Sequence, residues 1–325
     1  MTRLMLFLSL LIVCGLVGSA AYTRYRSSDV ADRFPPIGSF VEARGTRLHY
    51  LEQGRERGGP TVVLVHGASS NLLDMRLALG ERLAERYRVI LFDRPGFGWS
   101  DEPTGTNATS PRAQADLIHE ALDRLKVGRR IMVGHSWAGA LVLAYALDHP
   151  EVLDGVVALA PVSHPWPGGI SWYYSLTAAP IAGVLFAGTV MVPMAETLIA
   201  AAADGVFGPQ APPSDYVRKA GIPLILRPHS FRRNARDVAA LYDFVVRQSR
   251  HYGEIVVPVT IVAGADDTTV LPSIHSEALK REVPDVRLVM LEGVGHMPQY
   301  ARPEVVIAEI DRLADRAAGR QTPSL

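Results

Sequence analysis

Short, mostly uncharged runs rich in β-branched residues alternate with helical patterns along most of this chain, and this alternation constrains its fold more than any other feature. Runs of this kind indicate strands buried on both faces, which is typical of a parallel sheet covered by helices. The first two runs are expected to form an antiparallel edge. The sequence therefore predicts an α/β fold with a mostly parallel sheet of about eight strands flanked by helices. The strand-like runs are 39–44, 47–52, 61–65, 88–92, 130–134, 155–160, 259–264 and 286–291.

The alternation stops in the range 163–252, where helical patterns follow one another with no strand between them. A long helical excursion inside an α/β pattern indicates a helical cap above the sheet. The core is therefore expected in two parts, 39–162 and 253–325, with the cap between them. Within the cap, Asn234 is interpreted as the N-cap of a helix whose apolar side chains recur at helical spacing.

Charge and cysteine content exclude several classes of protein. The chain has 33 Lys and Arg against 33 Asp and Glu, so it lacks the excess positive charge of a protein that binds nucleic acid by bulk electrostatics. Cys14 is the only cysteine, which excludes an intramolecular disulfide, and Cys/His zinc spacings do not occur. We therefore expect no nucleic-acid partner, no metal and no cofactor.

Residues 4–22 form an uncharged apolar segment close to the length that a helix needs to cross about 30 Å of hydrocarbon. We interpret residues 1–26 as an uncleaved membrane anchor, because aromatic and basic residues follow the apolar run like the collar of a membrane interface. Residues 27–38 contain two prolines and are predicted to be a linker.

A cleaved signal peptide is the alternative interpretation of this segment. Small residues from Gly18 to Ala21 follow the apolar run, as they do before a signal cleavage site. Cleavage would make the protein secreted or periplasmic instead of membrane-anchored. The sequence does not determine on which side of the membrane the folded part lies, because basic residues flank the apolar run at both ends.

The segment GHSWAG at 134–139 follows a predicted apolar strand and opens an apolar helix. At such a turn the serine side chain projects from the backbone. The amide of the next residue, Trp137, faces the space where an oxyanion would form. Small neighbours permit the tight turn. Ser136 is therefore a candidate nucleophile.

A serine nucleophile needs a base to accept its proton and a carboxylate to orient that base. His296 and Asp267 each follow a predicted strand, so both are expected at the carboxyl edge of the sheet, where sites form in α/β folds. Asp266, beside Asp267, is the competing carboxylate, and we assign it a structural role.

Five segments together resemble the α/β-hydrolase fold family, in its serine-nucleophile branch. This resemblance implies Ser136 as nucleophile, Asp267 as acid and His296 as base. It also implies an oxyanion hole formed by the backbone amides of Ala68 and Trp137. The segments are HGASSN at 66–71, DRPGFGWS at 93–100, GHSWAG at 134–139, AGADDTTVLP at 263–272 and GVGHMPQYARPE at 293–304.

The same resemblance narrows the set of reactions that the chain is expected to catalyse. Family members that open epoxides or remove halide carry an aspartate where this chain has Ser136, so those activities are not expected. What remains is a serine hydrolase of the carboxylesterase or lipase kind, which cleaves a small-molecule or lipid-like acyl substrate with an apolar portion through an acyl-serine intermediate. Two alternatives stay open: a carbon–carbon bond hydrolase that uses the same three residues, and a non-catalytic binding protein that retains the fold.

Other residues in these segments have a structural interpretation. His66 is expected to hold the loop beside the oxyanion hole, and Asp93 to bond backbone amides in a sharp turn. The side chains of His135 and Trp137 either line the pocket or pack in the core, and the sequence leaves this choice open.

The cap sequence also suggests a surface that faces lipid. No Asp, Glu, Lys or Arg occurs from Gly155 to Ala195, and basic residues outnumber acidic ones from Arg218 to Arg250. An uncharged stretch beside a basic one suits a cap that lies on the membrane holding the anchor. Pocket lining and a solvated arginine-rich face are the ordinary alternatives.

Overall fold

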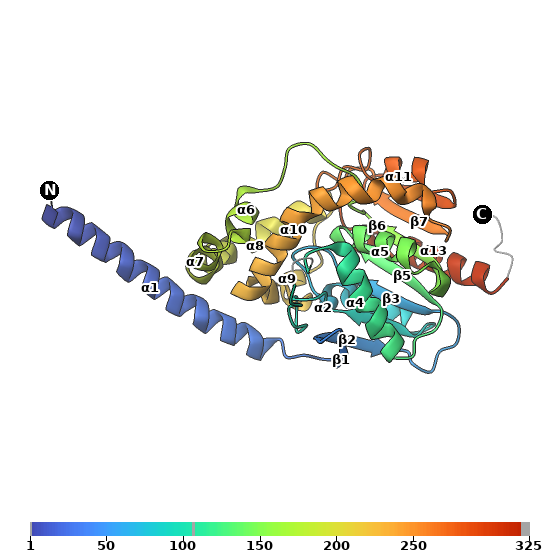
Figure 1. Cartoon of the computed structure of the whole chain (residues 1–325), viewed down its shortest axis with the longest axis horizontal. Helices are drawn as coiled ribbons and strands as arrows, with labels where there is room; N and C mark the ends of the chain where they lie inside the picture. The colour runs from blue at the N-terminus through green and yellow to red at the C-terminus, as the bar shows by residue number, and fades with distance from the viewer. Residues whose placement is uncertain (1, 106–107, 320–325) are drawn as a thin grey trace.

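The sheet is the central element of the structure, a computed structural model that describes residues 2–105 and 108–319. Within those residues, eight strands lie in the order β1-β2-β4-β3-β5-β6-β7-β8 (Figure 1). The β1–β2 and β2–β4 pairs are antiparallel and the other pairs are parallel, which confirms the predicted sheet and its antiparallel edge. The strands are β1 (Ser39–Ala43), β2 (Thr46–Gln53), β3 (Thr61–Val65), β4 (Val89–Phe92), β5 (Arg130–His135), β6 (Leu153–Leu159), β7 (Val259–Gly264) and β8 (Val286–Leu291).

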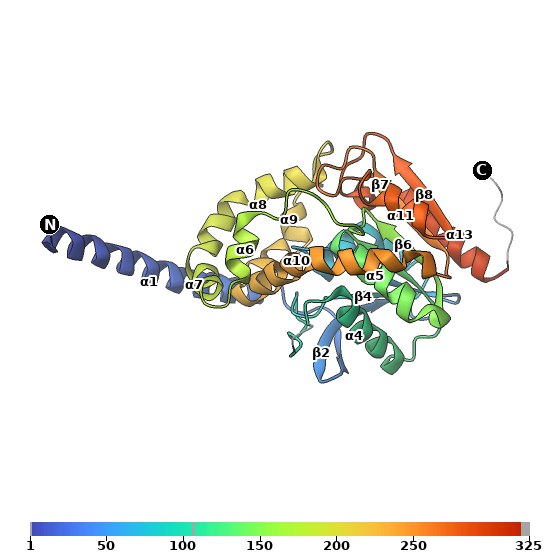
Figure 2. The same cartoon turned by 45° about the horizontal axis from the view of Figure 1, so that its top comes forward.

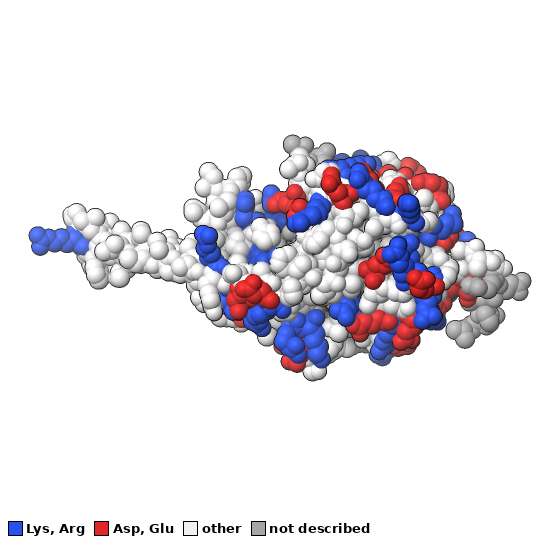
Figure 3. Space-filling view, turned by 90° about the horizontal axis from the view of Figure 1, so that it is seen from below, with Lys and Arg blue, Asp and Glu red and all other residues white. Residues whose placement is uncertain are grey.

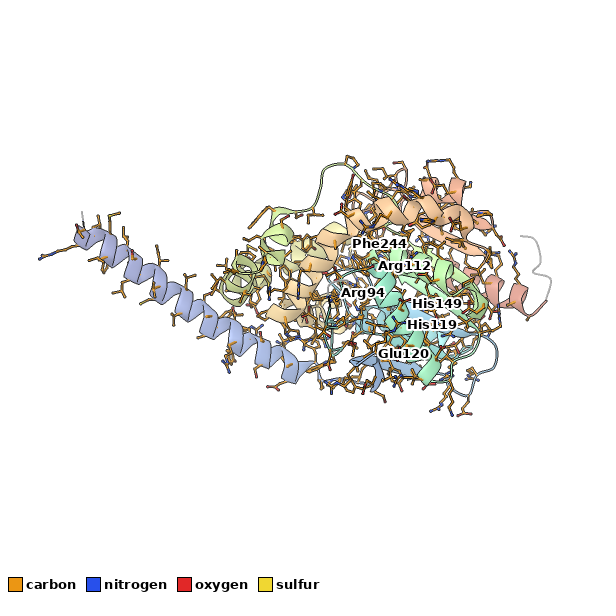
Figure 4. All side chains as sticks on the ribbon, in the orientation of Figure 1. Arg94, Arg112, His119, Glu120, His149 and Phe244 are labelled. Atoms are coloured by element: carbon orange, nitrogen blue, oxygen red, sulfur yellow. The ribbon has the colours of Figure 1, made fainter. Side chains whose placement is uncertain are left out.

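Helices cover both faces of the sheet, as expected for strands whose side chains are apolar on both sides. One face packs against α4 (Pro111–Arg124), α5 (Trp137–Asp148) and α11 (Ser276–Glu282). The other packs against α2 (Leu72–Met75), η1 (Arg76–Gly80), α3 (Glu81–Leu83) and α13 (Pro303–Ala317). The stacked rings of His119 and His149, with centroids 3.8 Å apart, join α4 to the end of α5 (Figure 4).

A helical insertion separates β6 from β7 and contacts the loop that follows β3 and the start of α5. Figures 1 and 2 show it as a group of helices at one end of the body, away from the C-terminus. Within the described residues it contains no strand, as the sequence predicts. Its elements are α6 (Trp172–Ala178), α7 (Ala182–Thr189), α8 (Met191–Phe207), α9 (Tyr216–Lys219), η3 (Ile222–Leu226), α10 (Pro228–Gln248) and η4 (Ser249–Glu254).

The start of α10 differs from the prediction. The helix begins at Pro228, whose fixed φ suits the first helical turn, so Asn234 lies inside the helix and is not its N-cap. The side chain of Asn234 is instead buried and bonded to Ser69. The interpretation of Asn234 as a cap is therefore wrong.

Two arginines of the predicted basic surface are also buried. Arg227 is 6% exposed and donates to the carbonyl of Leu224, and Arg233 is 1% exposed and pairs with Asp237 one helical turn away. A buried guanidinium requires such partners, because an unpaired charge in the interior is costly. These two residues therefore cannot contribute to a basic face toward lipid headgroups.

The N-terminal helix α1 (Thr2–Arg33) is longer than the predicted anchor. It continues through residues 27–33, so most of the predicted linker is helical and only 34–38 connect it to β1. Asp29 pairs with Arg26 and Arg33 at helical spacing, which favours the extra turns.

Among the described residues, α1 is the one helix that is by itself long and apolar enough to cross a membrane. α7 and α8 reach that length only when taken together, and they are bent by 67° at their junction. Figure 3 shows the N-terminal half of α1 projecting from the body without charge except at its tip.

Candidate active site

Ser136 occupies the single position between β5 and α5. Its backbone has φ 54 and ψ −115, a conformation that residues other than glycine rarely adopt. Neighbouring glycines make this turn possible. A Cβ on Gly134 would lie 2.4 Å from the carbonyl oxygen of Ala138, and one on Gly139 would lie 2.4 Å from Cβ of Pro161. The tight turn holds the serine at the carboxyl edge of the sheet.

The fold brings Ser136, His296 and Asp267 together, and we call these three side chains the Ser–His–Asp array. His296 Nε2 lies 2.9 Å from Ser136 Oγ, and His296 Nδ1 lies 2.7 Å from Asp267 Oδ2. A carboxylate only accepts hydrogen bonds, so Nδ1 carries the proton. Nε2 is then free to accept a hydrogen bond from the serine hydroxyl.

Asp267, and not its neighbour Asp266, belongs to the array. Its second carboxylate oxygen, Oδ1, accepts hydrogen bonds from the amides of Thr269 and Val270 at 2.8 and 2.9 Å. These bonds fix the carboxylate, which is 2% exposed, while Asp266 is exposed at the surface. Asp267 therefore presents its other oxygen to His296 in a fixed orientation.

His135, whose role the sequence left open, lies behind the array. Its Nε2 is 2.9 Å from the carbonyl oxygen of His296, so it donates a hydrogen bond there. Burial lowers the pKa of His135 to about 3, and the nearby His296 adds to this effect. His135 is therefore neutral at physiological pH and holds the backbone that carries His296.

The loop after β3 passes directly beside the serine. A Cβ on Gly67 would lie 3.1 Å from Cβ of Ser136, so a larger residue would crowd the Ser136 side chain. In the part of the chain that the structure describes, neither the Ala68 amide nor the Trp137 amide donates a hydrogen bond to another protein group. Both amides are therefore free to receive an oxygen atom of a substrate.

Arg94 supports this loop from its buried side. Its guanidinium donates to the carbonyl of Gly67 at 3.2 Å and to Asp237 Oδ2 at 2.9 Å. It also lies against the rings of Phe97 and Trp137, at 4.0 and 3.9 Å from their centroids. Burial lowers the pKa of Arg94 to about 10, an effect that Asp237 opposes. In Figure 4, Arg94 lies between the core helix α4 and α10 of the insertion.

Sequence reasoning missed a second support for the same loop. The Asn234 side chain accepts a hydrogen bond from the amide of Ser69 at 2.8 Å and donates one to Ser69 Oγ at 2.9 Å. Tyr174 Oη lies 3.2 Å from Ser69 Oγ, and burial raises the pKa of Tyr174. Asn234, Leu241 and Gln248 recur at helical spacing. This pattern could have revealed that Asn234 lies on the buried stripe of α10.

The remaining predicted residues have structural surroundings. His66 donates to the carbonyl of Gly67 and accepts from the amide of Arg94, so it holds the loop as predicted. Burial lowers the pKa of His66 well below its usual value. Asp93 accepts from the amide of Trp99 in the turn that follows β4, as predicted, and also from the amide of Leu72 at the start of α2. The Trp137 ring is 1% exposed and donates to the carbonyl of Asp237, which places it in the core.

A hydroxyl bonded to an imidazole, itself bonded to a buried carboxylate, is an arrangement suited to nucleophilic catalysis. Two unbonded backbone amides beside the hydroxyl are suited to stabilise an oxyanion. Among residues 2–105 and 108–319, three or more His, Cys, Asp or Glu side chains nowhere come together as a metal site.

Comparison with known protein families gives a match over most of the chain. The family described as the alpha/beta hydrolase fold matches residues 60–303, which include strands β3 to β8, the insertion and every member of the Ser–His–Asp array.

Individual relatives and solved structures point the same way. An uncharacterized protein of Mycobacterium tuberculosis is 26% identical over 304 residues, covering 88% of this chain and 83% of that protein. The bifunctional epoxide hydrolase 2 of Rattus norvegicus is 31% identical over 124 residues, 38% of this chain and 22% of that enzyme. The crystal structure of the enol-lactonase from Burkholderia xenovorans LB400 is similar in fold, with a TM-score of 0.64 and 20% identity over 85% of this chain and 99% of that one.

Proposed function

The chain belongs to the α/β hydrolase fold family, and on that premise we propose that it is a serine hydrolase. It cleaves an ester or a related acyl substrate with an apolar portion, through an acyl-serine intermediate. The observation that carries this proposal is the pair of hydrogen bonds, 2.9 and 2.7 Å long, that link Ser136 to His296 and His296 to Asp267.

The proposed reaction begins when Ser136 Oγ attacks the substrate carbonyl carbon and His296 Nε2 takes the hydroxyl proton. Asp267 stabilises the imidazolium that forms, and the amides of Ala68 and Trp137 donate to the oxyanion. The C–O bond to the leaving group then breaks, and His296 returns the proton to the departing oxygen. Water repeats the sequence on the acyl-enzyme, releasing the acid and restoring Ser136.

Epoxide opening is not proposed, although epoxide hydrolases are among the relatives. Opening an epoxide through a covalent intermediate requires a carboxylate nucleophile, whose ester is hydrolysed by water. The turn between β5 and α5 carries Ser136 instead, and a serine hydroxyl would form an ether that water does not cleave.

We also propose that residues 163–252 act as a cap on the site between the core parts 39–162 and 253–325. Tyr174 and Asn234 support this role, because both contact Ser69, the residue after Ala68. The absence of charged residues from Gly155 to Ala195 favours a substrate with an apolar acyl or alcohol portion. α1 is proposed as the uncleaved anchor of the protein in a membrane.

The test is hydrolysis of p-nitrophenyl esters of increasing acyl length by the full chain and by its Ser136→Ala variant. We expect turnover by the wild type, with kcat/KM rising from acetyl to longer acyl groups. Ser136→Ala should lower kcat by at least about 10⁴-fold, because the nucleophile is lost. A fluorophosphonate probe should label the wild type at Ser136.

Ser175→Ala is the matched control, because Ser175 is an exposed serine on α6. This variant should keep both hydrolysis and labelling. Retained activity or labelling in Ser136→Ala would contradict the proposal.

A further inference from the structure

The helical insertion has an uncharged surface that is open to solvent. Three large side chains on it stand out by their exposure: Trp172 of α6 is 64% exposed, Ile181 just before α7 is 79% exposed and Leu185 of α7 is 63% exposed. Val184 of α7, Val190 between α7 and α8, and Leu198 of α8 are also exposed. We call these six residues the apolar patch. A cluster of this kind marks a surface that contacts another apolar phase.

The patch lies beside the place where α1 leaves the body. α1 contacts α7 and α8 along its second half, where Thr23 and Val30 are buried. Ser19 donates to the carbonyl of Thr189, the last residue of α7, at 2.5 Å. Figures 1 and 2 show α7 next to the middle of α1, with the N-terminal half of α1 projecting beyond it.

Polar bonds fix this arrangement on the side facing the body. Arg26 Nε donates to Glu196 Oε1 at 2.6 Å, and Tyr22 Oη donates to Glu196 Oε2 at 2.5 Å. Glu196 is the first charged residue of the insertion after the uncharged stretch. We call these bonds of Glu196 with Tyr22 and Arg26 the charged clasp. It lies where the uncharged run of α1 and the uncharged stretch 155–195 both end.

We infer that the apolar patch inserts into the interface of the bilayer that α1 enters, so that α6, α7 and the start of α8 lie in the headgroup and upper acyl region. A bilayer is the occupant that fits, because the patch continues the uncharged surface of α1 and lies beside the charged clasp that holds α1 to the body. An exposed tryptophan among aliphatic side chains is typical of a membrane interface. The apolar side chains of the patch supply the driving force, and the buried Arg227 and Arg233 do not serve as headgroup ligands.

This inference rests on the proposed role of α1 as an anchor and not on the proposed chemistry. A single label on native Cys14, which is exposed on α1, reports on the anchor alone. A label on Ile181→Cys in a Cys14→Ser background reports on the patch. Val256→Cys in the same background is the matched control. Val256 is 76% exposed and lies just before the amino end of β7, whereas the insertion lies over the carboxyl ends of the strands.

The experiment reconstitutes each full-length protein, labelled with a nitrobenzoxadiazole fluorophore, in phosphatidylcholine vesicles with or without brominated acyl chains. We expect brominated lipid to quench the labels at 14 and 181 by at least about twofold and to leave the label at 256 unchanged. Intrinsic fluorescence should show the same quenching, and Trp172→Phe should remove that component, which excludes an artefact of the label.

Three results would overturn the inference. Quenching at 14 without quenching at 181 would mean that the anchor is inserted and the patch is not. A blue-shifted label at 181 that brominated lipid does not quench, and that depends on the protein-to-lipid ratio, would assign the patch to contact between copies of the chain. Absence of quenching at 14 would refute the anchor and this inference together, without bearing on catalysis by Ser136.

Discussion

The backbone of Ser136 is held in a conformation that costs on the order of 1–3 kcal/mol for a residue other than glycine. Such strain persists only where the surroundings determine the backbone completely. Here Gly134 and Gly139 let the backbone on either side of Ser136 pack against Ala138 and Pro161 more closely than a Cβ would allow. The position of the hydroxyl is therefore built into the sheet and helix that flank it.

Asn234 should influence turnover through Ser69. Replacing it by leucine removes the acceptor of the Ser69 amide, so the backbone that carries the Ala68 amide is less well held. We expect Asn234→Leu to lower kcat by about tenfold with little change in KM, less than the 10²–10³ typical of losing an oxyanion donor outright. Steady-state kinetics on a p-nitrophenyl ester measures both constants.

Asn234→Asp is the control for this prediction. An aspartate keeps the oxygen that accepts from the Ser69 amide, so most of kcat should return. Equal kcat values for the leucine variant and the wild type would show that the contact has no part in turnover.

His135 should make the protein less stable in acid. Its pKa is about 3 in the folded protein and about 6.5 when unfolded, so below pH 6.5 the unfolded chain binds the additional proton. This contribution to stability is complete above pH 6.5 and is lost as the pH falls toward 3. Between pH 7 and pH 5, wild type should therefore lose about 2 kcal/mol more unfolding free energy than His135→Gln.

Denaturant titrations of the two proteins at several pH values would measure this difference. The groups that both proteins share cancel in the comparison. Parallel curves for the two proteins between pH 7 and pH 5 would contradict the assignment.

The residues of the Ser–His–Asp array could be predicted because each stands in a local motif at the end of a recognisable strand. The contacts of Asn234 could not, because its partner Ser69 lies 165 positions away. Helical spacing shows that a residue lies on the buried stripe of a helix, but not which loop that stripe meets.

At the scale of elements, a buried charged group joins α10 to the core. Asp237 lies 2.9 Å from a guanidinium nitrogen of Arg94 and 2.8 Å from one of Arg233, and all three side chains are buried. Burial raises the pKa of Asp237, and the two arginines oppose that rise. Gln114 of α4 donates to the same carboxylate at 2.9 Å, so three segments meet at one residue.

Asp237→Ala should destabilise the fold strongly, because it leaves the buried guanidinium of Arg94 without its counter-ion and that of Arg233 with only Glu102, 3.7 Å away. Loss of one partner of a buried ion pair typically costs about 3–5 kcal/mol of unfolding free energy. Asp243→Ala is the matched control, since Asp243 is exposed on the same helix and its loss should cost less than about 0.5 kcal/mol. Chemical denaturation measures both changes, and similar values for the two variants would refute this role for Asp237.

The sheet and most helices could be predicted from uncharged runs and helical spacing, whereas the burial of Arg233 could not. An arginine on a helix is ordinarily solvated, and its burial requires an acidic partner that is itself held by another segment. Arg94 and Asp237 lie 143 positions apart, so no local pattern signals that they meet. For a similar reason the helix through 27–33 was missed, since its turns are stabilised by ion pairs with Asp29 and by Val30 packing on the body.

At the scale of the whole molecule, α1 should remain part of the mature protein. Its second half packs on α7 and α8, so it has a structural place as well as an apolar sequence. We expect the protein to stay with membranes after alkaline carbonate extraction and to keep the mass of the chain that begins before Leu4. A mature mass that corresponds to cleavage near Ala21 would show that the segment is a signal peptide.

The clasp between Glu196 and α1 has a consequence for how the enzyme encounters its substrate. A body tied to its anchor by a flexible tether would sample all orientations and meet molecules dissolved in bulk water. With α1 as the proposed anchor, a body clasped to it should keep one height and one tilt, so that its encounters with amphiphiles become a two-dimensional search. The rate of the proposed hydrolysis should then follow the mole fraction of substrate in the lipid, and dilution of that substrate with inert lipid should slow it even when the total amount is unchanged.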